Sequence, residues 1–166
     1  MIKKPVLKLL NEQINKEFYA AYLYLGMSAK CTDMNRDGFA SWLRIQAEEE
    51  IEHAMKIYDY VTEQSESVEL TPIAKPDIKG KTLLEFFKQA YEHEQLVTAS
   101  INNIMDAAVK EKDYASQIFL QWFVTEQIEE ESQTSNIVDD LTFAKNDVAA
   151  ILAIEKKLAK RKEDDD

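Results

Sequence analysis

The stretch Glu48-Glu49-Glu50-Ile51-Glu52-His53 lies inside a long run of residues with helical periodicity. Side chains spaced three and four residues apart share one face of a helix, and that face normally packs against a core. A buried carboxylate is strongly destabilising unless a charged partner neutralises it. Glu50-x-x-His53 therefore indicates one half of a metal site. The shared face reads Phe39, Leu43, Gln46, Glu50, His53, Ile57 and Tyr60.

Three other long segments carry the same kind of apolar face, and a potential metal ligand interrupts each face near its middle. The first segment is interrupted at Glu17 and the third at Glu94. A shift of 77 residues (94 − 17) maps Glu17 onto Glu94 and also maps Glu50 onto Gln127. This internal repeat of a helical hairpin doubles the site. The inward-facing residues predicted in this way are Glu17, Glu50, His53, Glu94, Gln127 and Glu130.

Composition sets limits on the class of protein. The 166 residues include only three Gly and three Pro, which favours an all-α fold in a single domain over residues 1–166. The formal charge of −11 argues against nucleic acid as a partner. The single cysteine, Cys31, excludes an internal disulfide and is typical of a reducing cytosol. We find no secretion signal and no apolar run of about 18 residues, so we expect a cytoplasmic protein without a membrane span.

Capping signals predict where the helices lie. We expect four long helices over about residues 5–32, 35–64, 82–111 and 113–145, a shorter fifth helix over about 147–160, and a frayed charged tail over 161–166. The first and third helices have strong start signals, Pro5 and the capping-box sequence Thr82-Leu83-Leu84-Glu85. The predicted caps of the other helices are Asp33 or Asn35, then Asp113, and then Asn146 or Asp147.

The spacing of the ligands from the predicted turns indicates one common site. With turns at Asn35 and Lys112, Glu17 and His53 each lie 18 residues from the first turn, and Glu94 and Glu130 lie equally far from the second (35 − 17 and 112 − 94). All four ligands then sit at one level of the bundle, roughly 27 Å from the turns. Residues 65–81 form a longer connection than a helical hairpin needs. We therefore expect a crossover that leaves the second and third helices parallel.

The chemistry of the set favours a pair of metal ions. Four carboxylates in a dry centre cannot all stay ionised without cations. Oxygen-rich ligation with a single imidazole suits iron or manganese better than softer metals. Di-iron carboxylate bundles use one Glu from each of two helices and Glu-x-x-His from each of the other two. Because Gln127-x-x-Glu130 replaces the second Glu-x-x-His, we expect a less tightly held second metal, as in a site that passes iron on.

The chain also resembles the bacterial non-haem ferritins over nearly its whole length. That resemblance implies a four-helix bundle with a short fifth helix, 24 copies assembled into a hollow shell, oxidation of Fe(II) by dioxygen or peroxide, and storage of ferric oxyhydroxide inside. The residues that carry it are Asn11-Glu12-Gln13 with Glu17, Tyr24, Glu49-Glu50-x-x-His53, Tyr91-x-His93-Glu94-Gln95, and Leu120-Gln121-Trp122 followed by Glu126-Gln127-x-Glu129-Glu130.

The same resemblance implies roles for individual residues. Bacterioferritins, the haem-binding relatives, have a second Glu-x-x-His and a Met after the helical ligand Glu. This chain has Glu130 and Ile51 at those positions, so we expect no haem. Carried over by position, the first iron is held by Glu17, Glu50 and His53, and the second is held by Glu50, Glu94 and Glu130, with Gln127 close by. A third iron would be held by Glu49, Glu126, Glu129 and Glu130. Tyr24 matches the site tyrosine of the family.

Two alternatives remain open at this point. A di-metal oxidoreductase of the peroxidase or oxygenase type can use the same fold without storing mineral, and a metal-free helical interaction module needs no site at all. Outside the ligand set, we expect His93 at the surface or behind the ligands and Cys31 in the core. The apolar face of the fifth helix, formed by Val148, Ile151, Leu152 and Leu158, is expected to contact another subunit.

Overall fold

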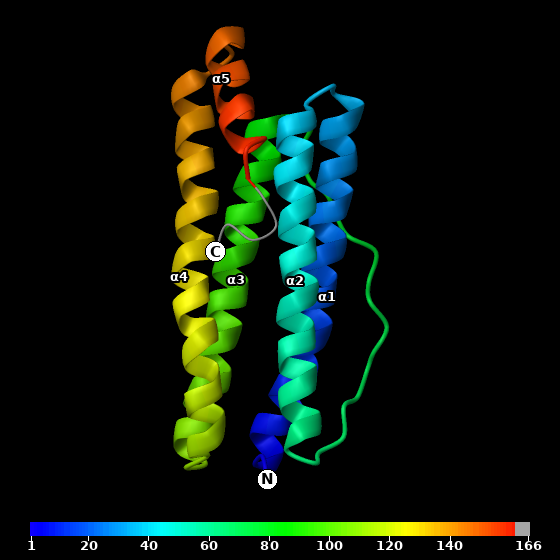
Figure 1. Ribbon diagram of the computed structural model, residues 1–166, viewed down its shortest axis with the longest axis vertical. Helices are drawn as coiled ribbons and strands as arrows, with labels where there is room; N and C mark the ends of the chain where they lie inside the picture. Colours follow the sequence, from blue (N-terminus) through cyan, green and yellow to red (C-terminus); the bar gives the residue numbers. More distant parts are fainter. Residues whose placement is uncertain (162–166) are drawn as a thin grey trace.

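The computed structural model describes residues 1–161 and consists of helices in a long bundle (Figure 1). Four of them, α1 (Lys4–Asp33), α2 (Asp37–Glu63), α3 (Leu83–Lys110) and α4 (Tyr114–Ala144), lie side by side, and the shorter α5 (Val148–Leu158) packs at one end. The predicted all-α fold, with four long helices and a short fifth one, is confirmed. None of these helices combines the length and apolar character needed to cross a membrane.

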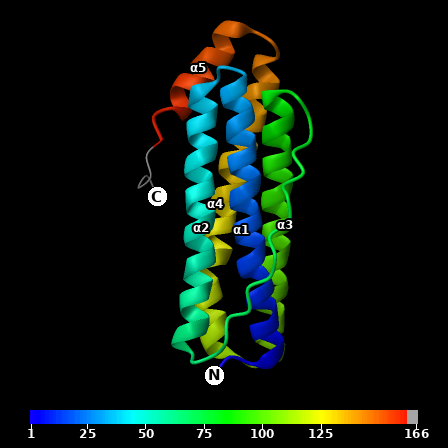
Figure 2. The same cartoon turned by 90° about the vertical axis from the view of Figure 1, so that its right-hand side faces the viewer.

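A long connection runs back along the bundle and leaves α2 and α3 parallel, as predicted (Figures 1 and 2). It lies against α1, whose side chains at four-residue intervals bind its backbone. The Nδ2 atom of Asn11 donates to the carbonyl of Ser67 (3.2 Å), and Nδ2 of Asn15 donates to that of Thr71 (3.0 Å). One polar stripe on α1 therefore fixes the course of the crossover.

The helix starts follow the capping signals with one exception. Thr82 and Glu85 form the predicted capping box, and Asp113 and Asp147 accept bonds from the backbone at the starts of α4 and α5. The prediction for α2 was wrong, because its N-cap is Arg36 without a side-chain bond. Asp33 still belongs to α1. Asn35 has a φ of 55° and forms the turn itself.

A distant residue supplies the missing cap of α2. Oε1 of Glu155, on α5, accepts a bond from the backbone N–H of Gly38 (3.1 Å). The same carboxylate lies 3.7 Å from the guanidinium of Arg36. Leu158, one turn further along α5, is buried in the bundle core, and Ile151 packs against that core, so these two residues of the face expected to contact another subunit cover their own subunit instead. The start of α2 and the position of α5 therefore depend on each other.

The bundle core is divided into two apolar clusters. Along α1, Ile14 belongs to the cluster near the N-terminus, Ala20 belongs to the cluster near α5, and Glu17 lies between them. Cys31 is buried in the α5-side cluster as expected, and burial raises the pKa of its thiol to about 12. The same interruption occurs on all four long helices. The buried polar residues between the clusters are Glu17, Glu49, Glu50, His53, Glu94, Gln127, Glu130 and Thr134.

The substitution Gly38→Ala should destabilise the docking of α5. A Cβ atom at this position would lie 2.5 Å from the backbone carbonyl oxygen of Glu155, which cannot move without the helix. We expect a loss of about 1–3 kcal/mol, measured as a fall in Tm by calorimetry. Gly26→Ala is the matched control, because its Cβ would meet only the end of the Ile78 side chain. That variant should be neutral or slightly stabilised, and equal losses in the two variants would contradict the prediction.

Candidate metal centre

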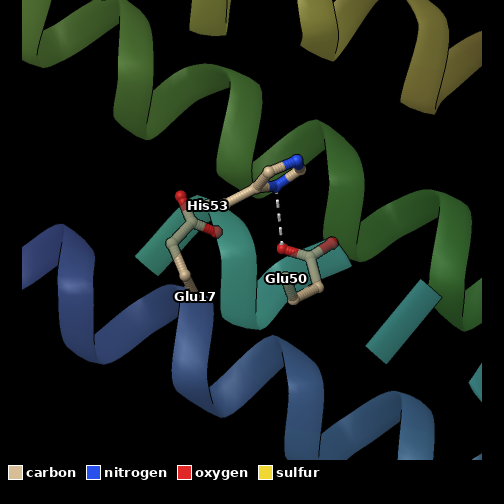
Figure 3. Close-up of side chains that lie close together, drawn as sticks. All are labelled: Glu17, Glu50 and His53. Carbon is tan, nitrogen blue, oxygen red and sulfur yellow. Dashed lines mark ion pairs between the residues drawn. The ribbon is translucent and has the colours of Figure 1, made fainter. Parts of the chain in front are cut away.

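Three buried side chains from two helices converge on one point near the middle of the bundle (Figure 3). Glu17 comes from α1, and Glu50 and His53 come from α2, one helical turn apart. Each side chain offers a ligand atom that lies within 4.8 Å of the other two. Nδ1 of His53 is 3.4 Å from Oε2 of Glu50. Two carboxylates and an imidazole thus form half of the predicted set.

The other half comes from α3 and α4. Glu94 is fully buried, and its Oε1 accepts a short hydrogen bond from the hydroxyl of Tyr24. The Nε2 atom of Gln127 donates to Oε2 of Glu94 (3.2 Å), so the Gln127 amide holds the Glu94 carboxylate in place. Glu130 is 3% exposed and lies close enough to His53 for the two to share a cation with Glu126. All six predicted inward-facing residues are buried.

Two glutamines that the sequence analysis did not assign to the site hold its carboxylates in place. The Nε2 atom of Gln13 donates to Oε1 of Glu17 (2.9 Å). Gln46 donates to Oε2 of Glu130 (2.7 Å) and more weakly to Oε1 of Glu50 (3.4 Å). The signal was available, because each glutamine precedes a ligand glutamate by four residues on the same face.

Burial shifts the proton affinity of the whole group. Desolvation raises the pKa of Glu17, Glu50 and Glu130 well above the usual value of 4.5, and a neighbouring carboxylate raises each further. Desolvation also raises the pKa of Glu94, although its bonds from Tyr24 and Gln127 act in the opposite direction. The metal-free centre therefore retains protons that a cation can replace.

Unpaired oxygen atoms show that this donor set suits a divalent metal. Oε2 of Glu17 and Oε2 of Glu50 are buried without a hydrogen-bond partner in the described chain. Such atoms are costly in a folded protein unless an ion or proton meets them. On both carboxylates the other oxygen accepts a bond from a glutamine. Glu17 and Glu50 thus each have one oxygen held by a glutamine and one available to a cation.

Two of the four residues expected to form a third site lie in one group of possible ligands. Glu126 lies with His53 and Glu130 in a group able to hold a cation. Glu49 is buried at the side of this group and is paired with Arg161. Glu129 is exposed and accepts a bond from Gln133 (3.1 Å).

Arg161 corrects one further prediction. It belongs to the tail that was expected to fray, yet it is held against α2. Residues 162–166 of that tail lie outside the described residues.

Comparison with known proteins agrees with this arrangement. A family model described as "Ferritin: Ferritin-like domain" matches residues 7–144. The chain belongs to the ferritin-like family. It is 47% identical to a bacterial non-heme ferritin of Campylobacter jejuni over 141 residues, which cover 85% of this chain and 84% of that protein. It is 40% identical over 166 residues to a bacterial non-heme ferritin of Staphylococcus haemolyticus, with full coverage of both chains.

The ferritin fold is also evident from solved structures. A crystal structure of an open-pore ferritin from the hyperthermophilic archaeon Archaeoglobus fulgidus superposes on this chain with a TM-score of 0.96. The two chains are 40% identical, and the match covers 98% of this chain and 100% of that one. The resemblance stated from the motifs is therefore confirmed.

A surface groove leads to the ligands of this ferritin-like chain. It lies between α2 and α4, has a volume of about 480 Å³, and reaches His53 beside Glu49 and Glu126. Asp59 and Glu63 add negative charge further along it. A groove with this lining attracts cations toward the buried centre.

His93 lies behind the ligands, half-buried between two tyrosine rings. Its ring centroid is 5.9 Å from that of Tyr19 and 6.1 Å from that of Tyr24. Burial lowers the pKa of the imidazole to about 4, so it is neutral at physiological pH. Tyr24, whose pKa is raised by its own burial and by the Glu94 carboxylate, likewise stays protonated and can donate.

The metal-free protein should lose stability as the pH rises above the usual carboxyl pKa of 4.5. The buried carboxyls hold protons above their usual pKa of 4.5, whereas the same groups in the unfolded chain have ionised. The folded state then binds more protons, and the free energy of unfolding falls until the raised pKa values are passed. We expect Tm in calorimetry to decrease by several degrees, since 1 kcal/mol shifts Tm by about 2–4 °C at this size.

The variant Glu17→Gln tests the origin of this slope. A glutamine carries no titratable proton, so the decrease of Tm with pH should become shallower in the variant. Zn²⁺ should raise Tm most at the alkaline end, because the cation replaces the protons. A Tm that rises over this pH range, or the same slope in the wild type and the variant, would contradict the assignment.

Proposed function

We propose that this chain is the subunit of an iron-storage ferritin that oxidises Fe(II) at a di-iron site within each subunit and keeps the ferric product in a hollow shell. The observation that carries the proposal is a set of four buried glutamates with raised pKa values at one level of the bundle. Iron is the substrate, and a surplus of negative oxygen ligands stabilises Fe(III) relative to Fe(II).

In the proposed site, Glu17, Glu50 and His53 bind the first iron. Glu50 bridges to the second iron, which Glu94 and Glu130 also bind. The unpaired oxygens of Glu17 and Glu50 support this assignment. The second position has an amide, Gln127, where a fully symmetric site has a carboxylate, and we expect a looser iron there.

Two Fe(II) ions each give one electron to dioxygen, which with two protons becomes hydrogen peroxide; peroxide can serve as the oxidant in a further round. The protein sets the geometry of this reaction and accepts or releases protons at its carboxylates. Tyr24 directs Glu94 through the hydrogen bond from its hydroxyl. Gln13 and Gln46 hold Glu17 and Glu130 in the same way. The acidic groove beside His53 gives cations a path to the site.

The remaining parts of the proposal concern the assembly and its extra iron. A third iron site involves Glu49, Glu126, Glu129 and Glu130, and no haem is required. The protein acts in the cytoplasm as a homo-oligomer of 24 subunits. The names of its relatives, which are ferritins, support a shell. Val148 and Leu152, exposed on α5, offer an apolar face for another subunit.

Glu50→Ala should lower the initial rate of Fe(II) oxidation at least about 100-fold. The substitution removes the bridging carboxylate and the partner of His53. The rate is followed as the absorbance of ferric species after mixing Fe(II) with oxygenated buffer. Glu48→Ala is the control, because Glu48 points outward and pairs with Arg44 on the surface of the same helix. A rate that is unchanged in Glu50→Ala, or reduced equally in the control, would contradict the site.

Aerobic loading distinguishes a storage shell from a di-metal oxidoreductase on the same fold. The shell should elute at several hundred kilodaltons in size-exclusion chromatography, since one chain has a mass of 19.2 kDa. After repeated additions of Fe(II), each subunit should contain many times more iron than its side chains can bind. A small oligomer that retains only a few metal ions would favour the oxidoreductase.

A further inference from the structure

The end of α5 directs one arginine toward the middle of the bundle. α5 is fixed to α2 by the bond from Gly38 to Glu155 and by the buried side chain of Leu158. Beyond α5 the chain makes a turn, in which the backbone N–H of Arg161 donates to the carbonyl of Leu158 (3.1 Å). The described end of the chain, drawn in red, thus leads from α5 toward the middle of the bundle (Figure 1).

The guanidinium of Arg161 is held by three residues of α2. Its Nη2 atom donates to both carboxylate oxygens of Glu49, at 2.7 and 2.5 Å. Its Nη1 atom donates to Oε1 of Gln46 (3.0 Å). The guanidinium carbon lies 4.7 Å from the centre of the Trp42 ring. The two charged side chains are only 11% and 8% exposed, which distinguishes this pair from the solvated ion pairs on the surface.

This contact reaches the proposed iron site through one amide. Oε1 of Gln46 accepts from Arg161, so its Nε2 atom must face the other way, toward Glu130 and Glu50. Arg161 therefore fixes the orientation of the amide that holds a ligand of the second iron. A residue from the C-terminal segment and the bundle centre belong to one hydrogen-bond network.

The same contact occupies a carboxylate that the third site needs. A nearly buried glutamate requires a positive partner, and a guanidinium that donates to both of its oxygens is a strong one. A metal ion that binds Glu49 neutralises the same charge and uses the same oxygen atoms. The arginine and the ion therefore compete for Glu49, and either one alone neutralises its charge.

We propose that Arg161 is a resident counter-ion of the third site. It holds Glu49 in the metal-free chain, and an ion enters the third site only by displacing it. The displaced guanidinium leaves Trp42, and the site fills after the inner pair, at higher metal concentration. This inference rests on the proposed function for the location of the third site. It adds that the C-terminal segment controls when that site becomes available.

Titration with Zn²⁺ tests the competition without any redox reaction. We expect two ions per subunit to bind the wild type first, followed by a weaker third ion, as measured by calorimetry. In Arg161→Gln the third ion should bind at least about tenfold more tightly. In a Trp122→Phe background the emission of Trp42 should change only with the third ion, and Arg161→Gln should abolish that change.

Matched variants separate competition from a general effect of charge or folding. Lys160→Gln removes the same charge from the preceding, exposed position and should leave the third affinity unchanged. Arg161→Lys keeps the charge but loses the planar guanidinium that binds Glu49 and Gln46 through different nitrogens, and should give an intermediate affinity. Glu49→Gln should eliminate the third ion with either residue at position 161. Circular dichroism and size-exclusion chromatography establish that each variant is folded and assembled.

Three outcomes decide between the ideas. Equal third-ion affinity in the wild type and Arg161→Gln overturns the counter-ion role, and so does an equal gain in Lys160→Gln. Absence of a third ion in both the wild type and Arg161→Gln overturns it as well, while binding of the first two ions leaves the inner pair of the proposed function standing. Failure of every variant, and of the wild type, to bind the first two ions overturns the proposed function itself.

Discussion

The structure depends on one electrostatic constraint, the burial of four glutamates at a single level of a narrow bundle. Their desolvation raises the pKa of each carboxyl, and one oxygen atom each of Glu17 and Glu50 has no hydrogen-bond partner in the described chain. This level separates the core into two apolar clusters that share no residue. Stability therefore has to come from the clusters on either side, while the layer between them is reserved for ions or protons.

The two helical hairpins contribute unequally to this layer. The 77-residue repeat maps Gln13 onto Ala90 and Gln46 onto Phe123, so the second hairpin has no amide at either equivalent position. Its ligands also take donors from the first hairpin: Tyr24 donates to Glu94, which Gln127 binds as well, and Gln46 donates to Glu130. The hydrogen bonds that orient the ligands also join the hairpins. The two halves of the site therefore differ in the residues that orient their ligands, and also in having Glu130 where the first hairpin has His53.

Features with a local or periodic cause could be predicted from the sequence. The capping box at Thr82, the cap at Asp113, the parallel α2 and α3, and the burial of the six inward-facing residues each follow from spacing within one helix or one connection. The cap of α2 could not, because it comes from Glu155, more than a hundred residues away. The position of Arg161 was missed for the same reason. A charged tail is expected to be solvated, and only the docking of α5 on α2 shows that its first residue is not.

The fifth helix connects the end of the bundle with its centre. α2 begins without a side-chain cap of its own, and Glu155 supplies both an acceptor for Gly38 and a charge for Arg36. That docking fixes the direction in which the chain leaves α5, and so brings Arg161 to Glu49. The docking of α5, which contributes none of the proposed ligands, therefore reaches the buried glutamates through Arg161.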